Sequence, residues 1–169
     1  MGQKKRRLDF RSGEDVLAEI ERLRTGGYVA TKNWNLSQIC EHLTKTMEGE
    51  MTGLGFRFPW LFRKTAGPLL TLWVLRTRSM PSVPTLPSLQ PAAAEGMDDS
   101  KIIDDCVETV RKAEAFSGNL DDYPFVDGLT ADRWRQIMWV HAAHHLGFLM
   151  PDQRRALSAK ALSDSMSPG

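Results

Sequence analysis

Cysteine is scarce in this sequence, and neither sign of charge is in clear excess. The 169 residues include two cysteines, Cys40 and Cys106, which are too few for a disulfide scaffold and suit a reducing cytoplasm. Lysine plus arginine total 22 and aspartate plus glutamate 21, so the formal net charge is +1. A dedicated nucleic-acid-binding protein usually has a larger basic excess. We therefore expect the basic residues 4–7 to be solvated, and contact with nucleic acid is the less favoured alternative.

Long apolar runs are also absent. Residues 8–11 (LDFR) follow the basic start where a secretory signal needs an apolar stretch, so we expect a cytoplasmic protein. The most apolar window, residues 66–75 (AGPLLTLWVL), would rise about 15 Å as a helix, half the thickness of a bilayer core. The sequence therefore predicts no transmembrane segment. A buried helix explains this window better than a helix lying on a membrane surface.

Helix signals are abundant. Hydrophobic residues make up 41% of the chain and charged residues 25%, the composition of a globular protein with a core. Ser12, with Asp15 three residues later, predicts the start of a first helix, which the glycines at 26–27 end. Asn35 and Gln38 form the same kind of capping signal for a second helix.

Prolines set apart a later part of the chain. Four of them predict an extended connector over residues 79–98, because each removes a backbone donor and disfavours helix before it. They are Pro81, Pro84, Pro87 and Pro91. An acidic helix is expected from about residue 99 to residue 116, and Thr130 caps a last helix over 131–149, which Pro151 ends. No segment shows the pattern of a strand.

These elements predict an all-α fold, a four-helix bundle in a single domain spanning residues 1–151. The C-terminal tail, residues 152–169, is expected to add at most a loose turn. A long crossover, residues 50–98, connects the second and third helices and consists of an extra helix near 60–78 and the proline-rich connector. Such a crossover can return the chain along the bundle, so that these two helices run parallel.

Charge is unevenly distributed along the chain. Residues 51–94 contain five basic side chains and no acid, whereas residues 95–132 contain eleven acids and three bases, a net charge of −8. We expect the two segments to face each other or the solvent. The alternative is that the basic segment approaches an anionic ligand, such as a cofactor phosphate or the carboxylate of a thiol peptide.

Three of the four histidines lie within five residues. At about 100° per residue, His145 lies about 40° from His141 on the inward stripe of the last helix, and His144 lies at the edge of that stripe. Two imidazoles one turn apart can chelate a single metal ion. The alternative is a pair of core histidines that are hydrogen-bonded to carboxylates or carbonyls.

The fourth histidine, His42, is a third candidate ligand, but periodicity does not favour it. The apolar stripe of the second helix is centred near Leu36 and Leu43. His42 lies about 100° away from that stripe, beside Gln38 and Thr46, which places it on the flank of the helix. A flank position can still border the mouth of a bundle, where a catalytic metal would meet its substrate.

Several segments resemble a known family. Residues 33–43 (NWNLSQICEHL), the long crossover and the late His141-x-x-x-His145 pair are similar to the DinB/YfiT-like family of metalloenzymes. Within that family the chain resembles an uncharacterised bacterial branch through residues 8–23, 47–49, 80–81, 123–125 and 129–130. The likeness spans about residues 6–151. It implies a four-helix bundle whose metal is held by one histidine of the second helix and two of the fourth, here His42, His141 and His145.

A three-histidine site leaves coordination positions open for water or a substrate atom, as catalytic sites do. A divalent ion there, such as zinc, nickel or iron, lowers the pKa of a bound water or thiol and supplies a nucleophile near neutral pH. The resemblance extends to thiol-dependent transferases, so we expect a metal-dependent hydrolase or a low-molecular-weight-thiol transferase. Its partner would be a small-molecule substrate or a thiol cofactor. The candidate general bases are Glu41, Glu48, Asp121 and Asp122.

A non-catalytic function is the alternative. Trp139 and Leu146 lie about 140–160° from His141, so the last helix has a second apolar face. Either the crossover covers this face or a second subunit does, which would make the protein a homodimer. A helical-bundle interaction module of this kind needs no metal chemistry.

Overall fold

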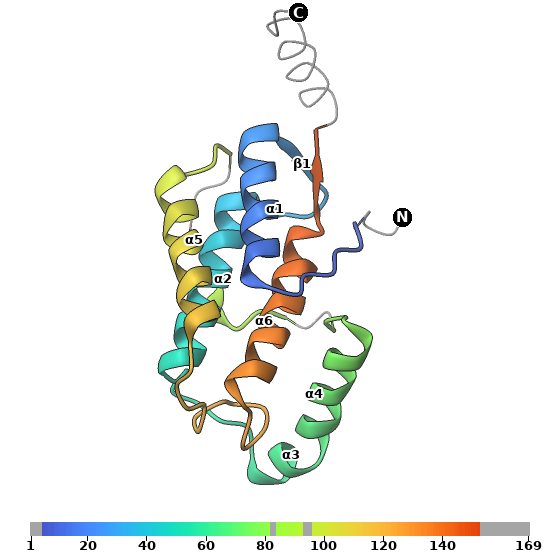
Figure 1. Cartoon of the computed structure of the whole chain (residues 1–169), viewed down its shortest axis with the longest axis vertical. Helices are drawn as coiled ribbons and strands as arrows, with labels where there is room; N and C mark the ends of the chain where they lie inside the picture. The colour runs from blue at the N-terminus through green and yellow to red at the C-terminus, as the bar shows by residue number, and fades with distance from the viewer. Residues whose placement is uncertain (1–4, 82–83, 93–95, 153–169) are drawn as a thin grey trace, which may run out of the picture.

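The computed structural model describes residues 5–81, 84–92 and 96–152, and this part of the chain is mostly helical with one small sheet (Figure 1). The helices are α1 (Gly13–Gly26), α2 (Leu36–Thr52), α3 (Trp60–Lys64), α4 (Ala66–Thr77), α5 (Ser100–Ala115) and α6 (Ala131–Leu146), with a short 3-10 helix, η1, at Pro87–Leu89. The strands are β1 (Tyr28–Ala30) and β2 (Leu149–Pro151). The turn predicted in the C-terminal tail lies outside the described residues.

Side-chain caps start the long helices where the sequence predicts them. The Ser12 side chain accepts a hydrogen bond from the backbone N–H of Asp15, and the Asp15 side chain accepts one from the backbone of Ser12, so α1 begins with a complete capping box. Asn35 and Gln38 form the same box at the start of α2. The side chain of Thr130 accepts a bond from the first turn of α6. These caps satisfy backbone donors that a helix leaves unpaired in its first turn.

Polar contacts at both ends show that α2 and α5 run parallel. Near their starts, the backbone N–H of Asp99 donates to Ser37 Oγ (2.6 Å). Near their ends, Thr109 Oγ1 donates to Glu48 Oε1 (3.1 Å). The long connection between them, residues 53–99, therefore returns the chain to the level at which α2 begins (Figure 1).

α1 and α6 run antiparallel to this pair. The backbone N–H of Gly13, at the start of α1, donates to Glu114 Oε2 at the end of α5 (2.6 Å). Trp134, near the start of α6, donates from Nε1 to Glu50 Oε2 near the end of α2 (2.7 Å). The largest fully buried side chains include Ile20, Leu23, Leu36, Leu43, Met47, Ile103, Trp134 and Leu146. All four of these helices contribute to this core, which fixes the faces on which they meet.

The expectation of no strand is wrong. β1 and β2 pair antiparallel, with Ala30 opposite Leu149. Each strand has three residues, which is too short to show the alternation by which strands are recognised in a sequence. Because β2 begins at residue 149, α6 ends at Leu146 with Gly147 as its cap, earlier than predicted. The pairing ties the end of α6 to the segment that leads into α2.

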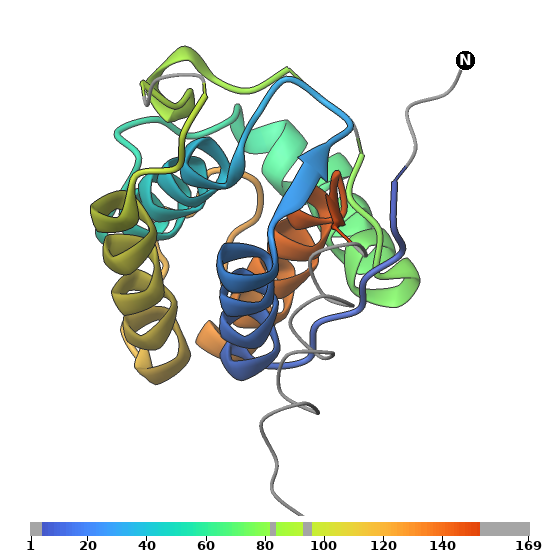
Figure 2. The ribbon, with the colours of Figure 1, turned by 90° about the horizontal axis from the view of Figure 1, so that it is seen from above.

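The basic side chains of the connection face acidic residues of the rest of the chain, as predicted. Asp127, in the loop before α6, pairs with Arg57, Arg63 and Lys64 over 2.7 to 3.2 Å. A Cβ added to Gly67, at the start of α4, would lie 1.9 Å from the carbonyl oxygen of Phe125 in the same loop. The loop and α4 are therefore in direct contact, and Figure 2 shows α4 beside α6, on the side away from α5.

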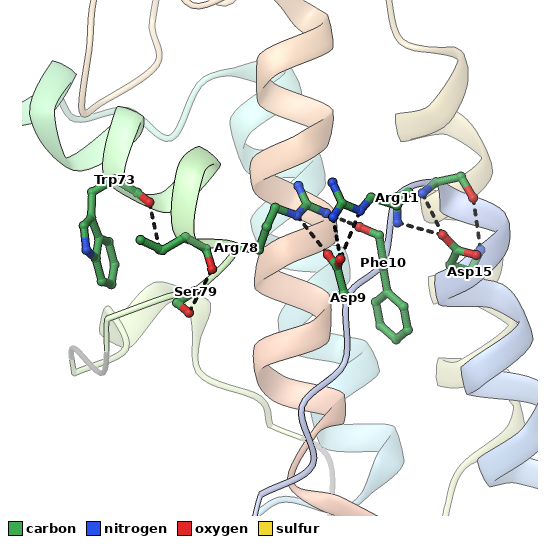
Figure 3. A network of polar contacts seen from close by, with 9 residues as sticks. Asp9, Phe10, Arg11, Asp15, Trp73, Arg78 and Ser79 are labelled. Carbon is green, nitrogen blue, oxygen red and sulfur yellow. Dashed lines mark hydrogen bonds and ion pairs between the residues drawn. The ribbon is translucent and has the colours of Figure 1, made fainter.

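A second ionic contact joins the end of α4 to the N-terminal segment (Figure 3). Nε of Arg78, the residue after α4, donates to Asp9 Oδ1 (2.9 Å), and the same guanidinium donates to the carbonyl of Phe10. Arg11 donates to the other oxygen of the Asp9 carboxylate. The backbone of Arg6 in turn bonds to the end of α6. The N-terminal segment therefore fastens α4 to α6 and to the start of α1.

The second apolar face of α6 is covered within the chain. Trp139 is 2% exposed and Leu146 is fully buried, so no second subunit is needed to cover them. The apolar window at residues 66–75 is instead only half buried, contrary to expectation. α3 and α4 expose Trp60, Leu61, Leu69, Leu72 and Trp73. None of the described helices has the length and apolarity to cross a membrane.

Candidate metal centre

Three histidine rings come together between α2 and α6. Nε2 of His141 lies 3.2 Å from Nε2 of His42 and 3.0 Å from Nε2 of His145. One ligand atom from each of the three side chains lies within 4.8 Å of the other two. The three histidines selected in the sequence are thus neighbours in the structure, which we call the histidine cluster.

His42 lies off the apolar stripe of α2, as predicted, yet it is 3% exposed and not at the surface. The reason is that α2 buries two faces. Its apolar stripe packs mainly toward α5, whereas His42, Thr46 and Glu50 follow one another at four-residue spacing on a polar face that lines a cavity. The spacing of apolar residues predicts only the face that packs toward α5, because the face that lines the cavity is polar.

A backbone carbonyl of the connection orients His42. Nδ1 of His42 lies 2.8 Å from the carbonyl oxygen of Leu89, at the end of η1. Because a carbonyl can only accept, Nδ1 carries the proton and Nε2 keeps a lone pair. This Nε2 is the atom that faces His141. Metal-ligating histidines commonly donate their other N–H to a carbonyl in this way.

The environment keeps the three imidazoles neutral. Burial lowers the pKa of His42. Burial, and then the neighbouring histidines, lower the pKa values of His141 and His145 well below the ordinary histidine range. Neutral imidazole is the form that ligates a metal ion, so these side chains need not lose a proton near neutral pH to do so.

Trp34, just before α2, holds two of the rings in place. Its indole stacks on the ring of His145 (centroids 5.6 Å apart, 20° between planes) and lies against the ring of His42 (5.1 Å). From the sequence alone Trp34 reads as a core aromatic. Because the indole packs against both imidazoles, it limits their rotation and so preorganises them.

His144 is excluded from the cluster. Its Nδ1 lies 3.0 Å from Nζ of Lys5, and its ring packs edge-on against Phe148. Burial, followed by the charges of Lys5 and Lys32, lowers the pKa of His144 to about 4. The side chain therefore accepts a hydrogen bond from Lys5 and borders the cavity beside the cluster, as its position at the edge of the stripe predicts.

The histidine cluster opens into a cavity of about 420 Å³. That volume falls within the range of small-molecule sites, roughly 300–1,000 Å³. Its other walls are mainly apolar and come from α4, from the segment after it and from the loop before α6. Examples are Leu70, Val74, Met80, Leu86 and Phe125. A ligand in this space would contact mainly apolar side chains while it touches the histidines.

None of the four candidate general bases lines the described walls of this cavity, but another carboxyl does. Glu50 lines it, is 7% exposed and accepts the hydrogen bond from Trp134. Burial raises the pKa of Glu50 to about 7. The sequence contains a signal for this residue, since Glu50 follows Met47 by three positions and so places a carboxyl at the edge of an apolar stripe.

The separations within the cluster fit a single cation. Zinc–nitrogen bonds of about 2.0–2.1 Å in tetrahedral geometry place ligand nitrogens roughly 3.4 Å apart. The two shortest separations in the cluster, 3.0 and 3.2 Å, are close to that value. The three donors are uncharged and of one kind, a set that suits zinc, nickel and iron.

The fold and site together define a mostly helical protein with a partly buried three-histidine cluster that could hold a metal ion. The chain belongs to the family described as Protein of unknown function (DUF1569), whose model matches residues 2–152. That description assigns no activity. No curated protein and no solved structure matches the chain.

Proposed function

We propose that this protein is a metal-dependent enzyme, a hydrolase or a low-molecular-weight-thiol transferase, in which His42, His141 and His145 hold one divalent cation. The observation that carries this proposal is the convergence of three neutral Nε2 atoms at the wall of a cavity. The ion would be zinc, nickel or iron. A small-molecule substrate or a thiol cofactor would occupy the cavity.

We further propose that the fold is a four-helix bundle of DinB-like type, in a single domain of residues 1–151. The packing of α1, α2, α5 and α6 supports this, as does the parallel course of α2 and α5 after a long crossover. The histidines also lie on the helices that the resemblance implies, one on the second long helix and two on the fourth.

Each neighbour of the cluster has a distinct part in this proposal. When bound, the ion lowers the pKa of a water or a thiol and so supplies a nucleophile. The carbonyl of Leu89 fixes the tautomer of His42, and Trp34 limits the rotation of His42 and His145. The apolar walls exclude water, which strengthens electrostatic interactions within the cavity.

Metal analysis of protein without a polyhistidine tag tests the site. We expect one equivalent of zinc, nickel or iron per chain in the wild type, and a loss of affinity of more than about 100-fold in His145→Ala. His144→Gln is the matched control, because His144 is the adjacent histidine on α6 but lies outside the cluster. Wild-type protein that binds no divalent ion, or His145→Ala that binds as tightly as wild type, contradicts the proposal.

Activity separates the two enzyme classes. A hydrolase should turn over activated esters or amides when metal-loaded, whereas a thiol transferase should conjugate a low-molecular-weight thiol to an electrophile. In either case His145→Ala should abolish turnover and His144→Gln should retain the metal-dependent rate.

The alternative function is a non-catalytic interaction module that forms a homodimer. The apolar side chains that α3 and α4 expose favour it. Sedimentation should then show a dimer that Leu69→Asp dissociates, and a monomer at high micromolar concentration contradicts this alternative.

A further inference from the structure

Glu50 and Tyr123 lie in the same cavity as the histidine cluster. Glu50 lies at a different level from the cluster, and its carboxylate is near enough to Tyr123 to act on the charge of the phenol. Glu50 is 7% exposed and Tyr123 is 4% exposed, and both line the cavity. Glu50 follows His42 by eight residues on α2, and its hydrogen-bond donor Trp134 precedes His141 by seven residues on α6. At 1.5 Å per residue the two levels are separated by about 10–12 Å along the helices.

Both groups keep hydrogen-bonding capacity that the described residues do not use. Oε2 of Glu50 accepts from Trp134, but no described group donates to Oε1. The described part of the chain likewise offers no hydrogen-bond partner to the hydroxyl of Tyr123. Both atoms keep some accessible surface, and both residues line the cavity, so the two atoms are open to it. An unpaired buried polar group is costly, so a ligand that pairs both groups is favoured.

The space between the two levels is mainly apolar, since the hydroxyl of Thr46 donates to the carbonyl of His42 within α2. Apolar residues of the cavity wall include Leu70, Val74, Ile137 and Met138. A ligand that reaches from one level to the other therefore needs an apolar body, with polar atoms confined to its ends.

We propose that Glu50 and Tyr123 form a subsite that recognises a terminal hydroxyl group on an elongated, otherwise apolar ligand whose other end lies at the histidine cluster. A hydroxyl donates one bond and accepts others, so it matches a carboxyl oxygen that accepts and a phenol that donates. The placement of the other end at a metal ion rests on the proposed function. The hydroxyl subsite rests on Glu50 and Tyr123 alone.

The charge state of the subsite favours a neutral partner. Burial raises the pKa of Glu50 to about 7, and burial together with the nearby Glu50 raises the pKa of Tyr123. Below about pH 7 both groups are therefore mainly uncharged, and an uncharged hydroxyl enters at a lower desolvation cost than an ammonium group would.

Two matched probes test the subsite, 8-mercaptooctan-1-ol and octane-1-thiol, which differ in one terminal hydroxyl. Binding is measured by calorimetry on metal-free protein and by thiolate-to-cobalt absorption on the cobalt-loaded protein. We expect the hydroxyl-terminated thiol to bind about tenfold more tightly to the wild type, the value of one net hydrogen bond. Tyr123→Phe should reduce this preference severalfold, and Glu50→Met should abolish it.

Thr71→Val is the matched control, because it removes a hydroxyl from the α4 wall of the same cavity. It should leave the tenfold preference unchanged. Equal affinity for the two probes in the wild type, no binding of either, or loss of the preference in Thr71→Val but not in Tyr123→Phe overturns the subsite. Failure to bind cobalt instead contradicts the proposed function, and the calorimetric comparison on metal-free protein still decides the subsite. Should Glu50→Met not fold, Tyr123→Phe gives the same decision.

Discussion

The carboxyl of Glu50 shows how one residue links stability to pH. Its folded pKa of about 7 lies above the ordinary glutamate value because it is buried. The carboxyl therefore remains protonated in the folded chain at a pH where the unfolded chain has already lost the proton. This contribution to stability is fully present below about pH 4.5 and is lost as the pH rises through 7.

We expect Glu50→Gln to remove this pH dependence. A glutamine keeps an oxygen for the N–H of Trp134 but cannot ionise. Between pH 4.5 and pH 8, the free energy of unfolding of wild-type protein should fall by about 3 kcal/mol more than that of the variant. Urea unfolding of metal-free protein at several pH values measures the difference.

Glu48→Gln is the control for this comparison, because Glu48 is an exposed carboxylate of the same helix and a glutamine keeps an oxygen for Thr109. It should follow the wild-type curve. Parallel curves for wild type and Glu50→Gln would show that Glu50 is already ionised in the folded chain at low pH.

Single residues also show what a sequence can reveal about the site. His141 and His145 lie on the inward stripe of their helix, so periodicity found them. The same test placed His42 on a flank, because the cavity-lining face of α2 is polar and has no apolar signature. The pattern leaves His42 an open candidate, and the resemblance is what favours it. Glu50, which lies at the edge of an apolar stripe, is not among the residues selected from the sequence.

The position of α4 depends on a close approach at its first turn. Gly67→Ala would bring a methyl group against the carbonyl oxygen of Phe125, which is part of the backbone and cannot rotate away. We expect α4 to shift and the free energy of unfolding to fall by about 2–3 kcal/mol. Denaturant unfolding checks the loss, and binding of an apolar dye checks whether the cavity has opened.

Gly26→Ala is the matched control, because nothing lies within 4 Å of a Cβ at that position. It should leave stability unchanged or raise it slightly, through the lower entropy of the unfolded chain. A Gly67→Ala variant as stable as Gly26→Ala would mean that α4 is not held against the loop before α6.

The start of α2 depends on the capping box of Asn35. We expect Asn35→Ala to lower the free energy of unfolding by about 1 kcal/mol, because the backbone N–H of Gln38 loses its acceptor. Asn35→Asp keeps an acceptor oxygen at the same position and should remain close to wild type. Equal losses in both variants would indicate that the amide nitrogen of Asn35, and not its oxygen, matters.

At the level of helices and strands, the sequence predicts helix starts correctly because each start depends on neighbouring residues. Ser12, Asn35 and Thr130 were predicted as caps and act as caps, because capping is decided within one turn of chain. The two strands were missed, since a pairing of three residues depends on partners more than 100 positions apart. The exposed face of α4 was missed because its apolar side chains resemble those of a buried helix.

At the scale of the whole molecule, the histidine cluster joins two helices that are far apart in the sequence, α2 and α6. An ion held by both would oppose global unfolding and not only local opening. At a free metal concentration of 100 times Kd, we expect the free energy of unfolding to rise by about 2.7 kcal/mol in wild type and not at all in His145→Ala. Urea unfolding with and without zinc measures both values.

The Asn35→Ala variant gives an independent check on this linkage. It retains all three histidines, so zinc should stabilise it by the same increment as wild type, from a lower starting point. A smaller increment would show that the cap also helps to form the cluster.

The contact between His42 and the carbonyl of Leu89 has a consequence for how such proteins can diverge. Every amino acid supplies a main-chain oxygen, so the identity of residue 89 is free to drift while the imidazole stays oriented. Insertions or deletions near residue 89 differ from substitutions, because they move the carbonyl oxygen that orients His42. Changes in loop length, more than point substitutions, would therefore alter the affinity of the proposed site for a metal ion while all three histidines stay in place.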